Sequence, residues 1–313
     1  MSRERKDWVD LAKGIAIILM VIGHSGIPEV VSSGIGVPHL VRNWIFSFHM
    51  PLFFLLSGAL TNWAYSYKEF VLHKSKTLLS YLILYSVINV LLLKISDAEF
   101  AEYSFIHVLQ NGWGGFALWF LAVLYLSLLC ARIFCNRYTL WAVSVCLVLG
   151  WGLAHYEIRL PWSLSTVPYA TALILIGKLS SPYLFGLTQI TLAHRYAVAA
   201  TAFLLCTTVA YCYRQLDLCV NKILPLIPML LGGVSGTLFI CLLSCKLCTF
   251  AVAKKIMLPI GRNTLEIMAF SQVFLIVQRN LPIHGSLKFV IMAIGIVLMV
   301  CLRKTISKRF FNN

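Results

Sequence analysis

Charged residues are scarce in this sequence. Asp, Glu, Lys and Arg make up 12% of its 313 residues, whereas 60% are apolar. Ordinary soluble domains contain roughly 25% charged and roughly 45–50% apolar residues. A soluble fold of this length cannot bury so much apolar surface, but a lipid bilayer solvates it. Because backbone groups in the hydrocarbon core must be hydrogen-bonded within their own segment, the sequence predicts an all-α polytopic membrane protein.

Acidic residues are especially few. Only 11 Asp and Glu stand against 26 Lys and Arg, which gives a formal net charge of +15. A nucleic-acid-binding protein of this charge would gather its basic residues into a patch or stripe. Here the Lys and Arg residues are spaced between apolar runs, as loop charges are in membrane proteins. We therefore expect membrane lipid as a partner and no nucleic acid.

Paired cysteine spacing is also missing, because the 10 Cys residues are scattered through apolar segments. Cys241, Cys245 and Cys248 would share one face of a helix, but a structural metal site needs a fourth ligand and none is evident nearby. We interpret them as small packing residues and expect no metal. The first apolar run follows Arg3 and Arg5 yet lacks a small-x-small cleavage site, which indicates a retained helix rather than a signal peptide.

With about 20 residues needed for one crossing, the hydropathy pattern predicts about ten spanning helices. The connections between them are too short for a soluble domain, so we expect residues 1–313 to form a single transmembrane domain. Most Lys and Arg residues of the connections fall on the side shared by both termini, and this asymmetry predicts cytoplasmic termini. The predicted segments are 9–27, 43–63, 77–94, 114–131, 138–154, 162–178, 196–213, 223–245, 257–277 and 286–302.

The first predicted helix is the richest in ionisable residues. At about 100° and about 1.5 Å per residue, Asp10, Lys13 and His24 share one face, and Lys13 lies about 16 Å from His24 along the axis. Ionisable groups inside a span are costly and are therefore candidates for function. A structural interpretation stays open for each: Lys13 extends to the membrane interface, and His24 caps the end of its helix.

Other polar residues interrupt the later segments. His49 lies in the second segment and faces the same outer side of the membrane as the end of the first. Trp119 in the fourth segment is typical of packing or interface anchors, and Asn263 at the start of the ninth could cap a helix or line a cavity. Glu266 is either paired with Arg262 one turn earlier or part of a site.

Short motifs that combine polar residues with glycine or aromatic residues run through most of the chain. In chain order they are Trp8-x-Asp10-x-Ala12-Lys13-Gly14-Ile15, Gly23-His24, Phe48-His49-Met50-Pro51-Leu52-Phe53-Phe54 with Ser57-Gly58, Leu118-Trp119-Phe120-Leu121, Leu160-Pro161-Trp162-Ser163-Leu164 with Gly177, and Ile260-Gly261-Arg262-Asn263-Thr264-Leu265. In these motifs the chain resembles the membrane-bound acyltransferase family 3, whose members acylate cell-envelope sugars, and within it the fucose 4-O-acetylase type. Lys74 and Lys76 stand where members often carry Arg, and Ser271-Gln272 stands where many have His.

The resemblance implies acetyl-CoA as the donor and His24 as the catalytic histidine. A sugar hydroxyl becomes a good nucleophile when a base takes its proton, and imidazole, with an ordinary pKa of about 6.5, suits that task near neutrality. His24 would act as this general base or would carry the acyl group as an acyl-imidazole. Lys13, Lys74 and Lys76 would bind the phosphates of coenzyme A. The thioester brings its own leaving group, so no metal is required.

The acceptor is expected to be a cell-envelope or exported saccharide, free or lipid-linked, at a bacterial inner membrane. His49, Trp119 and Asn263 would line the acceptor side. A transporter or flippase for a lipid-linked saccharide is the main alternative, and repeated halves with broken helices would favour it. In a third interpretation the polar residues only join helices of a structural membrane protein.

Overall fold

The structure, a computed structural model, describes residues 6–25, 38–96, 117–136, 138–213, 216–278, 281 and 283–311. Arg3 and Arg5, which precede the first helix, lie outside these residues. Every regular element of the described part is a helix, which confirms the predicted all-α class. The α-helices are α1 (Asp7–Ser25), α2 (His39–Leu60), α3 (Tyr67–Lys74), α4 (Ser80–Ile95), α6 (Trp119–Phe134), α7 (Thr139–His155), α8 (Val167–Gly186), α9 (Leu192–Cys212), α10 (Leu226–Leu247), α11 (Ala251–Arg262), α12 (Thr264–Val277) and α13 (Gly285–Phe311).

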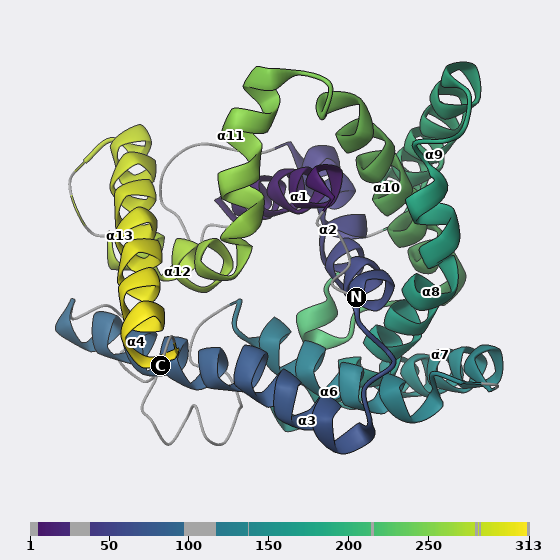
Figure 1. Cartoon of the computed structure of the whole chain (residues 1–313), viewed down its shortest axis with the longest axis horizontal. Coiled ribbons are helices and arrows are strands. Elements are labelled where there is room, and N and C mark those ends of the chain that lie inside the picture. Colours follow the sequence, from purple (N-terminus) through teal and green to yellow (C-terminus); the bar gives the residue numbers. More distant parts are fainter. Residues whose placement is uncertain are drawn as a thin grey trace.

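Helices α1 and α2 lie in the middle of the molecule, and the other helices surround them (Figure 1). Helix α2 packs against α1, α8, α9 and α10, and α1 also packs against α11. Two glycines let α2 and α8 approach closely. A β-carbon at Gly58 would lie 1.9 Å from the carbonyl oxygen of Ile174, and one at Gly177 would lie 2.0 Å from that of Leu55. Small residues at such crossings are typical of helix packing in membranes.

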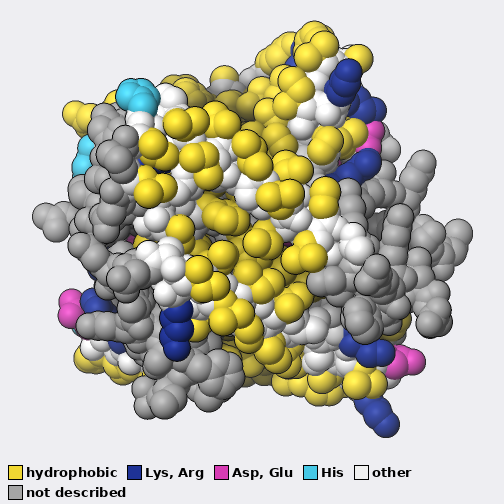
Figure 2. All heavy atoms as spheres, turned by 90° about the vertical axis from the view of Figure 1, so that its left-hand side faces the viewer, with side chains coloured by type: hydrophobic (Ala, Val, Ile, Leu, Met, Phe, Trp, Pro, Cys, Tyr) yellow, Lys and Arg dark blue, Asp and Glu magenta, His cyan; other side chains and the backbone are white. Residues whose placement is uncertain are grey.

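Five helical spans are long and apolar enough to cross a membrane, and the bent pair α11–α12 makes a sixth if it counts as one span. Helices α6 and α7 are apolar but shorter. The face formed around α13 is covered mainly by hydrophobic side chains, with Lys and Arg toward its margins (Figure 2). These features, together with the composition, make the chain a membrane protein. The predicted count of ten crossings stays a prediction.

Several predicted segments differ from the observed helices. The segments predicted at 162–178 and 286–302 end eight and nine residues later, in α8 and α13. Two others differ in their course. The segment predicted at 257–277 is broken, because the axis turns by 76° between α11 and α12 at Asn263. The Asn263 side chain donates to the carbonyl oxygen of Pro259 at 2.6 Å, which holds the end of α11 at the break. The segment predicted at 77–94 starts earlier, since α3, a π-helical turn at Ser75–Leu79 and α4 run on as one span.

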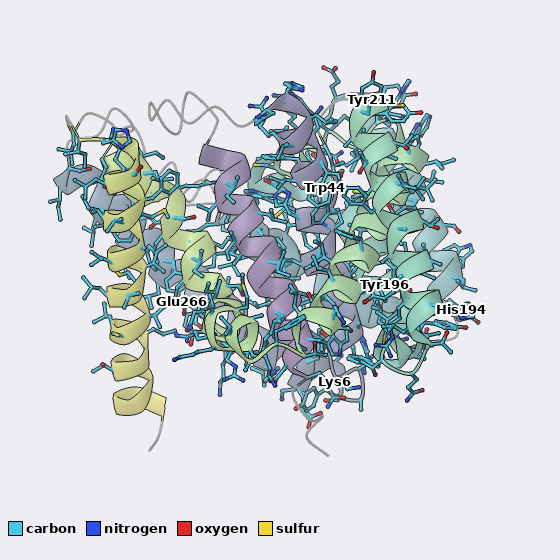
Figure 3. The ribbon with its side chains drawn as sticks, turned by 90° about the horizontal axis from the view of Figure 1, so that it is seen from above. Lys6, Trp44, His194, Tyr196, Tyr211 and Glu266 are labelled. Carbon is cyan, nitrogen blue, oxygen red and sulfur yellow. The ribbon has the colours of Figure 1, made fainter. Side chains whose placement is uncertain are left out.

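The molecule has two ends, which we name the Lys6 end and the Tyr211 end after residues that mark them in Figure 3. Helix α1 starts at the Lys6 end, and α13 finishes there. Ion pairs at this end tie them together through the α11–α12 junction: Arg262 lies 3.4 Å from Asp10 of α1, and Arg303 of α13 lies 2.8 Å from Glu266 of α12.

Candidate active site

The two intramembrane histidines predicted from the sequence lie together. His24 is in the last turn of α1 and His49 is in the middle of α2, and their ring centroids are 6.0 Å apart in an edge-on arrangement. The ring of Phe46 packs against both, with its centroid 4.9 Å from each. His49 is buried and His24 is partly accessible. The structure therefore forms a histidine pair around one aromatic ring, toward the Tyr211 end of α1.

The hydrogen bonds of the two rings assign their tautomers. Nδ1 of His24 lies 2.8 Å from the carbonyl oxygen of Met20, and Nδ1 of His49 lies 2.9 Å from that of Ile45. A carbonyl oxygen only accepts, so each Nδ1 carries the proton and donates it. In the neutral rings this leaves Nε2 as the basic nitrogen. Both histidines are thereby fixed to their own helices by Nδ1 and keep Nε2 for other chemistry.

Gly23 sets the approach of α1 to α2 at this pair. A β-carbon at Gly23 would lie 3.0 Å from Cε2 of Phe46 and 3.2 Å from Cγ2 of Ile45. Both distances are shorter than ordinary van der Waals contact. A glycine next to His24 is therefore what lets the Phe46 ring reach the two imidazoles.

Trp119 lies near the same stretch of α2. It is the first residue of α6 and is buried beside Phe120. The Phe120 ring contacts those of Phe53 and Phe54, and Phe53 is one turn along α2 from His49. Phe120 therefore packs against the helix that carries His49, and Trp119 is its neighbour in the chain.

Lys13 and Lys74 line one cavity. Its volume is about 360 Å³, within the range of small-molecule sites. It lies where α1, the end of α2, α3 and α6 meet. Two Lys and one His, but no carboxylate, are among its lining residues, which are Lys13, Ser57, Leu60, Thr61, Asn62, Tyr65, His73, Lys74, Thr77, Leu78, Leu124 and Leu128.

The ammonium group of Lys74 is held at the cavity wall without a counterion among the described residues. It donates to Oγ1 of Thr61 at 3.4 Å and lies 5.4 Å from the centroid of the Phe70 ring. The π-helical turn begins directly after Lys74, and such turns occur frequently at functional sites. Lys76, by contrast, is exposed and does not line the cavity. The structure therefore brings two of the three predicted cations together.

Asn263 does not join the histidines. It lies at the α11–α12 junction, where its Oδ1 accepts a hydrogen bond from Arg303 at 3.2 Å. That junction packs against Asp10, in the first turn of α1, whereas His24 is in the last. Fourteen residues of helix, about 21 Å at the usual rise, separate Asp10 from His24. The structure therefore does not bring Asn263 together with His49, because the 76° bend keeps its side chain at the Lys6 end. Its predicted role on the acceptor side stays a prediction.

Glu266 is paired with a residue that sequence spacing did not indicate. Its Oε1 accepts from Tyr85 at 3.0 Å and lies 2.8 Å from Nε of Arg303, while the side chain is fully buried. Arg262, the neighbour one turn earlier, instead faces Asp7 and Asp10. An intramembrane Glu does signal a partner. That partner is 37 residues away in α13, so no local pattern could reveal it.

The fold and its site define a class of protein, a helical membrane protein with a histidine pair toward one end of its central helices and a cationic cavity toward the other. A family model described as an acyltransferase domain matches residues 6–302. The chain belongs to this family and is an acyltransferase. No curated protein and no solved structure significantly matches the chain.

Proposed function

We propose that this protein transfers an acetyl group from cytoplasmic acetyl-CoA to a hydroxyl of a cell-envelope or exported saccharide, as fucose 4-O-acetylases do. It would work in a bacterial inner membrane, with the Lys6 end and both termini in the cytoplasm. The observation that carries the proposal is the histidine pair, in which both Nδ1 atoms donate to backbone carbonyls and no hydrogen bond of either Nε2 atom is found among the described residues. The acyltransferase family of the chain favours this function over a transporter.

The Lys13–Lys74 cavity suits the donor. Coenzyme A carries several phosphate charges, and ammonium groups bind phosphate as point charges. Two such groups without a lining carboxylate give the cavity a positive character. Lys13 and His24 stand on one face of α1 and are about 16 Å apart along it. A donor held by its phosphates at Lys13 would therefore extend its long, thin thioester arm along α1 toward His24.

The chemical step at His24 needs one base and no metal. Nε2 of His24 takes the proton of the sugar hydroxyl as its oxygen attacks the thioester carbonyl carbon. A carbon–oxygen bond forms and the carbon–sulfur bond breaks. The departing sulfur then takes the proton from the imidazolium, which regenerates the base and releases coenzyme A as a thiol. His49 and Trp119, on and beside α2, would position the acceptor.

A second route uses His24 as an acyl carrier. Its Nε2 attacks the thioester and forms an acylated imidazole as the carbon–sulfur bond breaks and the thiolate leaves. The sugar oxygen then displaces the imidazole, and the hydroxyl proton passes to the thiolate. Incubating the purified protein with isotopically labelled acetyl-CoA and no acceptor separates the routes. Label retained on wild-type protein but absent from His24→Ala protein would assign the carrier route, and no retained label would assign the general base.

The proposal is tested by NMR measurement of O-acetyl groups on surface polysaccharide. Cells that lack the gene would be complemented with the wild-type chain, His24→Ala or His194→Ala, at equal membrane abundance. His194 is an exposed histidine at the Lys6 end and serves as the matched control (Figure 3). We expect the wild type and His194→Ala to restore acetylation and His24→Ala to fail. Restoration by His24→Ala, or no dependence on the gene, would overturn the proposal.

A further inference from the structure

Backbone strain is concentrated in two connections at the Tyr211 end. Four non-glycine residues of the described chain have positive φ: Glu157, Trp162, Ser163 and Asn221. The first three lie in the α7–α8 connection (156–166), and Asn221 lies in the α9–α10 connection, described over 216–225. Non-glycine residues rarely adopt a positive φ, and residues held in this backbone conformation cluster at functional sites. The proposed donor and histidine sites use none of these four residues.

The two connections are joined into one unit. Oγ1 of Thr166 donates to the carbonyl oxygen of Leu218 at 2.5 Å. Within the second connection, the backbone groups of Asp217 and Lys222 pair in both directions, at 2.8 and 3.2 Å. Their side chains and backbone enclose two adjoining cavities, of about 240 and about 250 Å³, that share Arg159 and Val220. We name the two cavities together the two-loop pocket.

Asn221 is a buried polar residue of the two-loop pocket. Its side chain is 4% exposed and lines the first cavity. Neither its Oδ1 nor its Nδ2 has a hydrogen-bond partner among the described residues. A buried amide without partners is costly, and most buried polar groups are paired. An amide in this state, on a strained backbone facing a cavity, is suited to bind hydroxyl groups of a ligand.

The charges around Asn221 favour an acidic ligand. Arg159 and Lys222 line the same cavity and outnumber its one carboxylate, Glu157. The nearby Asp217 is engaged within its own connection, where its Oδ1 accepts from the backbone N–H of Cys219 at 3.1 Å. Burial raises the pKa of the Asp217 carboxyl, while the charges of Lys222 and Arg159 act on it in the opposite direction. Asp217 does not line the cavity, whose charged lining residues are two cations and one exposed acid.

Trp162 adds an aromatic surface. It lines the second cavity together with Arg159, Pro161 and Ser165. An indole ring combines a large apolar body with a single donor, which suits contact with both the apolar and the polar edges of a sugar. Amide, guanidinium, ammonium, hydroxyl and indole groups thus face one connected space.

We propose that the two-loop pocket binds the acceptor, a saccharide that carries an acidic group, either a uronate carboxylate or a phosphate. The inference rests on the proposed function, because it names the class of saccharide that is acylated. The pocket lies at the Tyr211 end, toward which α1 presents His24, so donor and acceptor enter from opposite ends. Arg159 and Lys222 bind the acidic group, and Asn221 and Trp162 bind the sugar ring.

Binding is measured by calorimetry on full-length His24→Ala protein in lipid nanodiscs. This variant is used because, without the proposed base, it does not acylate the ligand during the measurement. The probes are trigalacturonate for a carboxylate, glucose 1-phosphate for a phosphate and maltotriose as the neutral sugar. We expect one acidic probe to bind at least tenfold more tightly than maltotriose. The tighter of the two acidic probes identifies the acidic group.

Substitutions then locate the binding site. Arg159→Gln and Asn221→Asp should each weaken binding of the acidic probe about tenfold, because each removes a charge-assisted or amide hydrogen bond. Asn221→Gly is the second variant at this position, since both Asp and Gly tolerate the left-handed backbone that Asn221 adopts. Lys94→Gln, an exposed Lys of α4 that lines neither cavity, is the control and should bind like the parent.

The inference is overturned if the acidic and neutral probes bind alike, if none binds, or if the substitutions at Arg159 and Asn221 leave the affinity unchanged. Acetylation of polysaccharide in cells separates it from the proposed function. If acetylation requires His24 but is unaffected by Arg159→Gln and Asn221→Gly, this pocket is not the acceptor site while the proposed function stands. Acid-specific binding without any acetyl transfer supports the pocket and overturns the proposed function.

Discussion

Gly261 of α11 lies against the backbone of Asp10 in α1 so closely that a β-carbon would be 1.7 Å from the Asp10 carbonyl oxygen. At the same crossing, a β-carbon at Gly14 would lie 3.0 Å from the Met257 carbonyl oxygen. Two glycines, one on each helix, thus permit backbone contact and place Arg262 beside Asp10. The crossing fixes the Lys6 end of the helix that carries Lys13 and His24.

Gly261→Ala is expected to destabilise the protein strongly. Overpacking usually costs about 1–3 kcal/mol and exceeds this where, as here, backbone atoms must move. Thermal unfolding in detergent measures the effect. Gly152→Ala is the control, because a β-carbon at that helical glycine of α7 would meet no atom within 4 Å. Equal melting temperatures for the two variants would contradict the close crossing.

Gly23→Ala should reduce acyl transfer more than stability. The added methyl group meets the side chains of Phe46 and Ile45 rather than backbone, so the ring can give way at about 1 kcal/mol, the lower end of overpacking costs. Its displacement disturbs the contact of Phe46 with His24 and His49. We expect at least a tenfold loss in kcat with wild-type membrane abundance. Full activity in this variant would show that the Phe46 position does not matter to the reaction.

Lys13→Gln and Lys74→Gln should each raise the KM for the acyl-CoA donor and leave kcat near that of the wild type. A hydrogen bond to a charged group contributes about 1.5–3 kcal/mol, which corresponds to a roughly 10- to 100-fold effect. Lys76→Gln, whose parent residue is exposed and outside the cavity, should change KM much less. Initial rates over a range of donor concentrations distinguish these outcomes. An equal rise in KM for all three variants would place the phosphates elsewhere.

Glu266→Ala should destabilise the protein by about 3–5 kcal/mol, since removing one member of a buried ion pair leaves the other charge without compensation. In this variant Arg303 has lost the carboxylate with which it pairs, and the Tyr85 hydroxyl has lost its hydrogen-bond acceptor. Lys254→Gln breaks an equally short pair with Asp7, at 2.6 Å, but both groups are solvent-accessible, so its effect should be small. Chemical denaturation in detergent compares them, and a similar loss in both variants would argue against burial as the cause.

Part of the site was predictable because it follows from helix geometry alone. Asp10, Lys13 and His24 share a face through the period of 3.6 residues, and their helix is observed where it was predicted. The sequence grouped Lys74 with Lys76 as cations for the donor, and it did not indicate that only Lys74 of the two lines the cavity. This difference follows from a helix that continues through both residues, so that Lys74 turns into the cavity and Lys76 turns out.

The partners of the remaining residues depended on contacts between distant segments. Glu266 finds Arg303, and Thr166 finds Leu218, through packing that no local spacing encodes. The sequence did not indicate that Phe46 belongs to the site, because it is one apolar residue in an apolar helix. In the structure its ring packs against both histidines. The left-handed residues Glu157, Trp162 and Ser163 of the α7–α8 connection gave no signal either, because the residues that favour such a backbone are Gly and, less strongly, Asn and Asp.

By itself the sequence determined that the protein is an all-helical membrane protein, since continuous apolar runs of about 20 residues satisfy their backbone hydrogen bonds in lipid as helices. It also determined which ionisable residues face one another along a single helix. Only the tertiary structure decided that the rings of His24 and His49 lie together and that Lys13 and Lys74 line one cavity. It also placed Asn263 apart from both pairs. The physical reason is that close crossings and bends, set by Gly261 and by the break at Asn263, choose which helix faces come together.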